Sequence, residues 1–114
     1  MPRNMSFAMT TDQVRAKTKT VTRRFGWWFL KPGDVVQPVE KAMGLQKGET
    51  VRKIGGLIRI ISTRREPLYA IDKADCIKEG FPDFDPGNFT DMLQDQYGCD
   101  MDAEVNRIEF EYIN

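Results

Sequence analysis

The chain has 114 residues, of which 40% are apolar and 30% are charged, and its 17 basic side chains balance 17 acidic ones. This length suits one domain, residues 1–114, whose core needs neither metal nor disulfide, and this composition excludes a disordered or membrane-embedded chain. Histidine is absent, which excludes His-dependent triads and His-based metal sites. Any catalysis must therefore use lysine, hydroxyl, carboxylate or thiol groups.

Simple sequence features also bear on location and cofactors. No apolar run approaches the roughly 20 residues that a membrane helix needs, and the N-terminal residues lack the apolar core of a signal peptide. Cys76 and Cys99 have neither metal-type spacing nor a second pair. We therefore expect a cytoplasmic protein with two free thiols, no metal or other cofactor and no membrane partner.

The first third of the chain predicts two short strands around a short helix. Residues 4–9 ("NMSFAM") alternate as a strand, and Thr10 or Thr11 is placed to cap a helix over residues 12–18. The β-branched residues of "KTVTRRF", residues 19–25, favour a second strand.

The middle of the chain predicts two further strands. A turn at Pro32 and Gly33 leads into a strand over residues 34–42, in which Pro38 indicates a sheet edge or a bulge. Residues 51–66 ("VRKIGGLIRIISTRRE") are the most strand-like part of the chain because they alternate over residues 57–63, and the pair Gly55 and Gly56 predicts a bend or bulge in this long strand.

The last third predicts two helices and a final strand. Asp72 is placed to cap a helix that ends at Gly80, and "PGNFTDMLQDQYG" predicts a second helix. Its inward stripe would consist of Phe89, Met92, Leu93 and Tyr97. Residues 104–114 ("EVNRIEFEYIN") alternate imperfectly as the last strand. Five or six strands with two or three short helices indicate an α+β protein built on a small curved sheet or barrel.

Charge is divided unevenly along the chain. Residues 1–66 contain 14 Lys or Arg against 5 Asp or Glu, whereas residues 67–114 contain 3 against 12. Either the basic half forms a face for an anionic partner, or the two halves attract each other within the fold. Both interpretations remain open from the sequence.

Five segments in order resemble one known family. They are "KTVTRR", "KPGDVV", "GLIRIISTRREPL", "DCIKEGF" and "RIEFEYI". Together, from about Asn4 to Ile113, they resemble the ASCH (activating signal cointegrator homology) family, and in particular its small bacteriophage-encoded members. The resemblance implies a PUA-like β-barrel with a cleft that binds RNA, a nucleotide or a nucleoside. Some compact bacterial members are amidohydrolases that remove the acetyl group from N4-acetylcytidine.

The resemblance also implies a catalytic triad. The Lys-Thr-x-Thr-x-Arg motif falls on residues 19–24, so that Lys19 is the base and Thr22 the nucleophile. Glu79, in "DCIKEGF", is the glutamate that orients the lysine.

Strand geometry favours a different set of ligand-binding residues. In a continuous strand Thr20, Thr22 and Arg24 share one face, with hydroxyls and a guanidinium suited to a base or phosphate, while Lys19 and Arg23 point the other way. Lys19 and Thr22 can meet only if Lys19 lies at the turn that enters the strand.

Three further side chains are candidate ligand contacts. Arg23 is a candidate for ligand binding, and Arg64, with Arg65, is a candidate for phosphate, although a solvated strand end is the alternative for the last two. Trp27 is a candidate for base stacking, with a core position as its alternative.

The sequence supports three functional interpretations. The first is an ASCH-domain protein that binds RNA, a nucleotide or a nucleoside in a cleft. The second is an N4-acetylcytidine amidohydrolase with the triad above. The third is an accessory protein of a phage whose acidic C-terminal half contacts a host protein.

Overall fold

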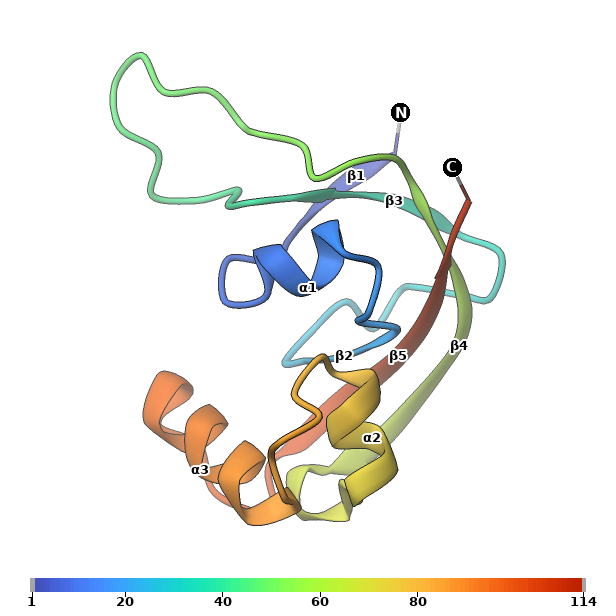
Figure 1. The fold of residues 1–114 in the computed structure, drawn as a ribbon, viewed down its shortest axis with the longest axis vertical. Helices are drawn as coiled ribbons and strands as arrows, with labels where there is room; N and C mark the ends of the chain where they lie inside the picture. Colours follow the sequence, from blue (N-terminus) through green and yellow to red (C-terminus); the bar gives the residue numbers. More distant parts are fainter. Residues whose placement is uncertain (1, 114) are drawn as a thin grey trace.

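The computed structural model describes residues 2–113, which form an α+β fold around one five-stranded mixed sheet (Figure 1). The strands follow the order β1-β3-β4-β5-β2 and have the bounds β1 Arg3–Ser6, β2 Val21–Arg24, β3 Val35–Val39, β4 Ile58–Pro67 and β5 Glu104–Tyr112. The β1/β3 pair is parallel and the other pairs are antiparallel. This confirms the α+β class. The sheet does not close within these residues, because β1 and β2 remain its two edges, so the predicted barrel is not confirmed.

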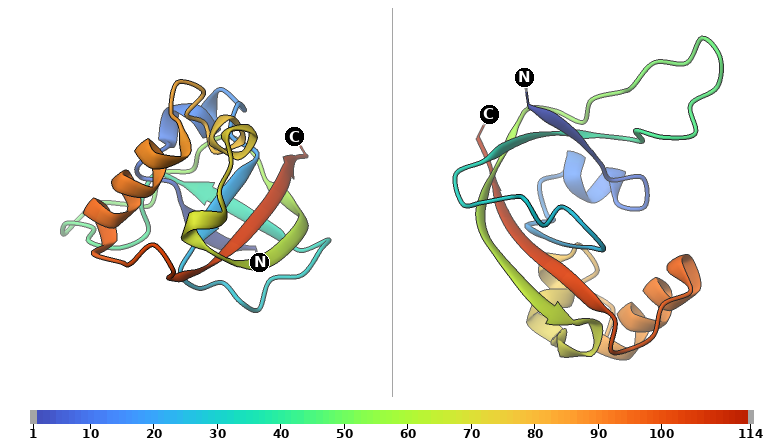
Figure 2. Two further views of the ribbon diagram at one scale, coloured as in Figure 1. Left: turned by 90° about the horizontal axis from the view of Figure 1, so that it is seen from below. Right: turned by 180° about the vertical axis from the view of Figure 1, so that it is seen from behind.

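The helices lie on the concave side of the curved sheet, as Figures 1 and 2 show. They are α1 Thr11–Arg15, the 3-10 turn η1 Leu68–Ala70, α2 Lys73–Lys78 and α3 Pro86–Tyr97. None of the helices between residues 2 and 113 combines the length and apolar character needed to cross a bilayer.

Local capping explains where the two later helices begin and end. The Asp72 carboxylate accepts a hydrogen bond from the backbone of Asp75, and Asp85 and Asn88 form a reciprocal capping box. Gly98 ends α3 in the left-handed conformation. Thr10 occupies the predicted N-cap position of α1, but its side chain makes no capping bond, and Thr11 donates to the carbonyl of Phe7 at 2.9 Å.

Two buried apolar clusters form the interior. The first lies between the sheet and α1 and contains Met5, Phe7, Val14, Leu30, Val36, Ile54, Ile58, Ile60, Ile108 and Phe110. The second lies between η1, α2 and α3 and contains Leu68, Ile71, Cys76, Phe89 and Leu93. Residues of both clusters border the pocket described below, so the site lies where the two cores meet.

The middle strands differ in detail from the prediction. The bend occurs at Gly55, whose φ is +62°, and the register of β4 shifts between Ile60 and Ser62. Pro38 does not lie on an edge strand, since β3 is flanked by β1 and β4. Proline is tolerated there because regular β3/β4 pairing has ended, and the Pro38 carbonyl accepts instead from Ile54 at 2.9 Å.

The predicted inward stripe of α3 is wrong at its last member. Phe89 and Leu93 are buried and Met92 packs against the same cluster, whereas Tyr97 is 55% exposed and contacts the ring of Phe25. The end of α3 therefore lies beside the pocket and not against the core.

Gly80 offers a direct test of how the end of α2 is held. Its φ is +99°, and a Cβ there would lie 2.7 Å from Cγ of Gln13, whereas Gly33 has a similar φ of +94° and open space around it. We expect Gly33→Ala to cost about 1 kcal/mol of unfolding free energy through its backbone alone. Gly80→Ala should cost roughly 2–3 kcal/mol, because Gln13 must also move. Urea denaturation measures both, and equal losses would contradict close packing of α1 against this turn.

Candidate functional site

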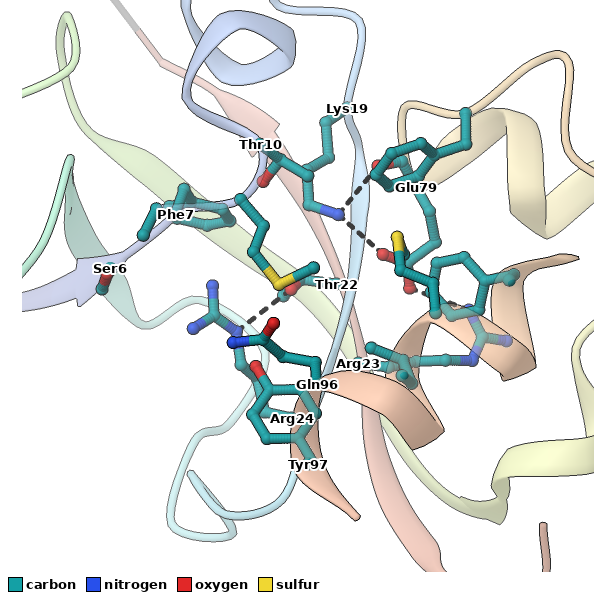
Figure 3. Close-up of a pocket in the computed structure, with 16 residues that line it drawn as sticks. Ser6, Phe7, Thr10, Lys19, Thr22, Arg23, Arg24, Glu79, Gln96 and Tyr97 are labelled. Atoms are coloured by element: carbon teal, nitrogen blue, oxygen red, sulfur yellow. Dashed lines mark hydrogen bonds and ion pairs between the residues drawn. The ribbon is translucent and has the colours of Figure 1, made fainter. Parts of the chain in front are cut away.

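A pocket of about 260 Å³ opens between the segment after β1, strand β2 and helix α3 (Figure 3). Its lining residues are Ser6, Phe7, Ala8, Met9, Thr10, Lys19, Thr22, Arg23, Arg24, Glu79, Phe81, Phe89, Met92, Leu93, Gln96 and Tyr97. The volume lies just below the usual range for ligand pockets, about 300–1,000 Å³. The pocket therefore suits a single small ligand and not an extended chain.

Lys19 enters this pocket because it precedes β2 and is not part of the extended strand. The Tyr112 hydroxyl donates to the Lys19 carbonyl at 2.6 Å, and the Thr20 amide donates to the Lys78 carbonyl at 2.8 Å. These contacts from β5 and α2 hold the entry to β2, so that Lys19 and Thr22 line the same pocket. Lys19 therefore lies in the segment that enters β2, outside the strand itself.

The Lys19 amine is buried against Glu79. Its Nζ donates to Glu79 Oε1 at 2.6 Å and to the Glu79 carbonyl at 2.8 Å, and each side chain is 3% exposed. Burial lowers the pKa of Lys19 from its ordinary value of 10.5, and this outweighs the attraction of Glu79, which raises it. The cations of Arg24 and Arg23 lower it further. The amine is therefore both held in place and shifted toward its neutral form.

Thr22 and Arg24 form the neighbouring part of the pocket. Arg24 Nε donates to Thr22 Oγ1 at 3.0 Å, and the Arg24 guanidinium lies 4.7 Å from the centre of the Phe7 ring. Because Oγ1 accepts from Arg24, the hydroxyl keeps its own proton free for another acceptor. Figure 3 shows Thr22 in one view with Lys19, Glu79 and Arg24.

Behind the pocket lies a network of buried ion pairs that the sequence did not reveal. Arg23 is 1% exposed and contacts Glu66 at 2.8 Å, Asp75 at 2.5 Å and Glu79 at 3.0 Å. Arg107 binds both oxygens of Asp75, at 2.7 and 2.9 Å. Hydrogen bonding from Arg107 and Arg23 holds the pKa of Asp75 well below its usual range.

Two sequence features could have indicated this network. The basic first half and acidic second half meet in it, since Lys19 and Arg23 pair with Asp75 and Glu79. At this site the charges therefore attract each other within the fold. The imperfect alternation of the last strand was the second signal, because the adjacent polar residues Asn106 and Arg107 are both buried in it.

Several residues that line the pocket were also not predicted from the sequence. Phe7 and Phe81 had no predicted role, and Tyr97 and Gln96 belong to a helix that was expected only to pack on the core. Their approach depends on how α3 docks, which no local pattern determines.

Three predicted site residues lie outside the pocket lining. Thr20 precedes β2, and its backbone pairs with Lys78 and Phe110. Trp27 packs against the first core cluster. The Arg64 side chain is 61% exposed and pairs with Glu66 at 2.8 Å. Lys19, Arg23 and Glu79 line the pocket together with Thr22 and Arg24, whereas Thr20, Trp27 and Arg64 do not.

Comparison with known proteins connects the chain to one solved fold. Models of protein families and curated proteins give no match. The crystal structure of protein EF3133 from Enterococcus faecalis V583, of family DUF984, matches with a TM-score of 0.64 and 14% sequence identity. The match covers 99% of this chain and 77% of that one. The likeness is one of fold. At this identity it carries no information on ligand or activity.

The ion pairs of Asp75 predict a specific pH dependence of stability. A carboxylate with a lowered folded pKa stabilises the fold above its unfolded pKa of 3.8, and the contribution is lost as pH falls toward the folded value. We expect Asp75→Asn to lose roughly 2 kcal/mol of unfolding free energy at pH 7. Chemical denaturation from pH 7 to 2 should show this difference from the wild type shrinking below about pH 4.

Asp95→Asn is the matched control, because Asp95 is exposed on α3. It should change the unfolding free energy by less than about 0.5 kcal/mol at each pH. A difference between Asp75→Asn and wild type that stays constant down to pH 2 would contradict the assignment.

Proposed function

We propose that the protein is an amidohydrolase that removes the acyl group from the exocyclic amine of a cytosine nucleoside, with N4-acetylcytidine as the first substrate to test. One observation carries the proposal. A buried lysine amine, held by Glu79, lines the same small pocket as Thr22. These are the three residues that the resemblance to the ASCH amidohydrolases assigns to the reaction.

The fold supports the same assignment. The curved five-stranded sheet with helices on its concave side is compatible with the PUA-like fold that the resemblance implies. DUF984, the family of the matching crystal structure, has an ASCH-like fold. We therefore place the chain among ASCH-like proteins as part of this proposal.

The reaction begins at Thr22. Its Oγ attacks the acyl carbonyl carbon while neutral Lys19 accepts the hydroxyl proton. The C–N bond then breaks, the Lys19 ammonium returns the proton to the departing amine, and the acyl group remains on Thr22 as an ester. Water attacks this ester, again with Lys19 as base, and releases the carboxylic acid and free Thr22. Protons and bonds balance over the two steps.

Each neighbouring group has a defined part in this mechanism. Burial makes Lys19 a base by lowering its pKa, and Glu79 directs its amine through two contacts. Among the described residues the terminal nitrogens of Arg24 have no hydrogen-bond partner, since its bond to Thr22 uses Nε. These free donors are available for the oxyanion that forms on the carbonyl oxygen.

Binding of RNA or a nucleotide without hydrolysis is the second candidate. One surface feature favours it: the Arg65 guanidinium lies 4.0 Å from the centre of the Trp28 ring. Arginine and aromatic side chains of this kind often bind single-stranded nucleic acid. The pocket itself favours hydrolysis. Lys19 is 3% exposed and its charge is taken up by Glu79, so it adds nothing to a positive groove.

The decisive experiment follows cytidine release from N4-acetylcytidine by chromatography. Thr22→Ala and Lys19→Met should each reduce kcat/KM by about a thousandfold, because nucleophile and base act as one unit. Thr20→Ala is the matched control, since this neighbouring threonine lies outside the pocket lining, and it should stay within about threefold of the wild type.

Full activity in Thr22→Ala, or an equal loss in Thr20→Ala, would contradict the mechanism. If the wild type releases no cytidine but binds RNA in a salt-sensitive manner, the binding function takes its place.

A further inference from the structure

Arg23 connects the pocket to three parts of the fold. Its terminal nitrogens contact Glu66 on β4, Asp75 in α2 and Glu79 directly after α2. A guanidinium presents several donors in a fixed plane, which lets one side chain hold several carboxylates at once. Strand β2 is thereby tied to β4 and to both ends of the short helix α2.

The Glu79 carboxylate is shared between two cations. Oε2 accepts from Arg23 at 3.0 Å, while Oε1 accepts from Lys19 at 2.6 Å. A guanidinium keeps its proton at every accessible pH, so that Lys19 is the partner that can lose one. We propose that Arg23 is a positioning residue, which holds one oxygen of Glu79 and so keeps the other on Lys19 without letting the carboxylate neutralise the lysine completely.

The alternative arrangement shows what this sharing achieves. Without Arg23, Glu79 is free to rotate and to give both oxygens to Lys19, and a buried one-to-one ion pair favours the charged ammonium. With Arg23 in place, Lys19 receives one carboxylate oxygen of Glu79, because Arg23 holds the other. The lysine is then under-compensated, which favours the neutral amine that a base requires.

The groups that face Lys19 are few among the described residues. Charge reaches it from Glu79 after α2 and from Arg23 and Arg24 of β2. From β5 the Tyr112 hydroxyl contacts its carbonyl, and burial raises the pKa of Tyr112 to about 12, which keeps this group neutral. The titratable Tyr97 of α3 and the uncharged residues Phe7, Ala8, Met9 and Thr10 line the same pocket.

Two of the carboxylates that contact Arg23 are bound by further arginines. Arg107 binds both oxygens of Asp75, and Arg64 contacts the second oxygen of Glu66. Arg23 Nε is buried and has no hydrogen-bond partner among residues 2–113. The other donors of Arg23 contact three carboxylates, one of which is Glu79. We infer that these carboxylates determine the position of the side chain, at the cost of one unpaired donor.

Arg23→Met tests the proposal, with Arg107→Met as the matched control. Both variants remove a buried arginine from the same ion-pair network, but among the described residues the Arg107 side chain forms its ion pairs with Asp75 and Glu109, and not with Glu79. The first measurement is the pKa of the Lys19 amine by NMR of the full chain with labelled lysine, assigned with Lys19→Arg. The second is the pH dependence of kcat/KM on N4-acetylcytidine.

The proposal makes distinct predictions for the two variants. In Arg23→Met the Lys19 pKa should rise by about one unit or more, so that kcat/KM at pH 7 falls about tenfold and recovers at higher pH. In Arg107→Met the pKa and the pH profile should shift by less than a third of that amount, while the denaturation midpoint falls. Arg23→Lys keeps the positive charge but loses the planar set of guanidinium donors. It should raise the pKa of Lys19 by a smaller amount.

An unchanged Lys19 pKa in Arg23→Met, or an equal rise in Arg107→Met, would overturn the proposal. If Arg23→Met does not fold, Arg23→Lys decides in its place, and an unchanged pKa there overturns the proposal equally. The activity readout rests on the proposed amidohydrolase, whereas the NMR readout does not. Failure of the hydrolase is therefore distinguishable from failure of the positioning role.

Discussion

The contact between Lys19 and Glu79 is the interaction on which the candidate site depends. It joins the entry of β2 to the end of α2, 60 residues apart in sequence, and it is buried. Burying a charge is unfavourable unless a partner and further hydrogen bonds compensate it. Glu79 supplies both a carboxylate and a carbonyl to the amine. The same burial that makes the pair costly lowers the pKa of Lys19. A lower pKa favours the neutral amine, which is the form that can accept a proton during hydrolysis.

The fold creates this environment by leaving a gap between two small cores. One core lies under the curved sheet and the other between the helices, and the pocket is bordered by Phe7 of the first and Phe89 and Leu93 of the second. Apolar walls lower the local polarity, while β2 brings Thr22 and Arg24 to the same space. A flat sheet with a single core would leave these side chains in water, where a lysine keeps its proton and a threonine does not attack an amide.

Much of the fold could be predicted because local patterns determine it. The cap at Asp72, the bend at Gly55 and the alternation of β4 each reflect short-range chemistry. The direction of Lys19 could not be predicted, because it depends on contacts with Tyr112 and Lys78, far along the chain. Alternation alone placed Thr20 in the site and left Lys19 doubtful, and long-range hydrogen bonds reversed that order. The network of Arg23, Asp75 and Arg107 was hidden for the same reason, since charged residues in a sequence are usually solvated.

The most direct test of the account is the intact mass of the protein during turnover of N4-acetylcytidine, quenched in acid. The mechanism predicts a transient species heavier by about 42 Da, with the acetyl group mapped to Thr22 and no such species in Thr22→Ala. An acetyl group on Lys19, or cytidine release with no covalent species at any time under single-turnover conditions, would show that Thr22 is not the nucleophile and would contradict the account.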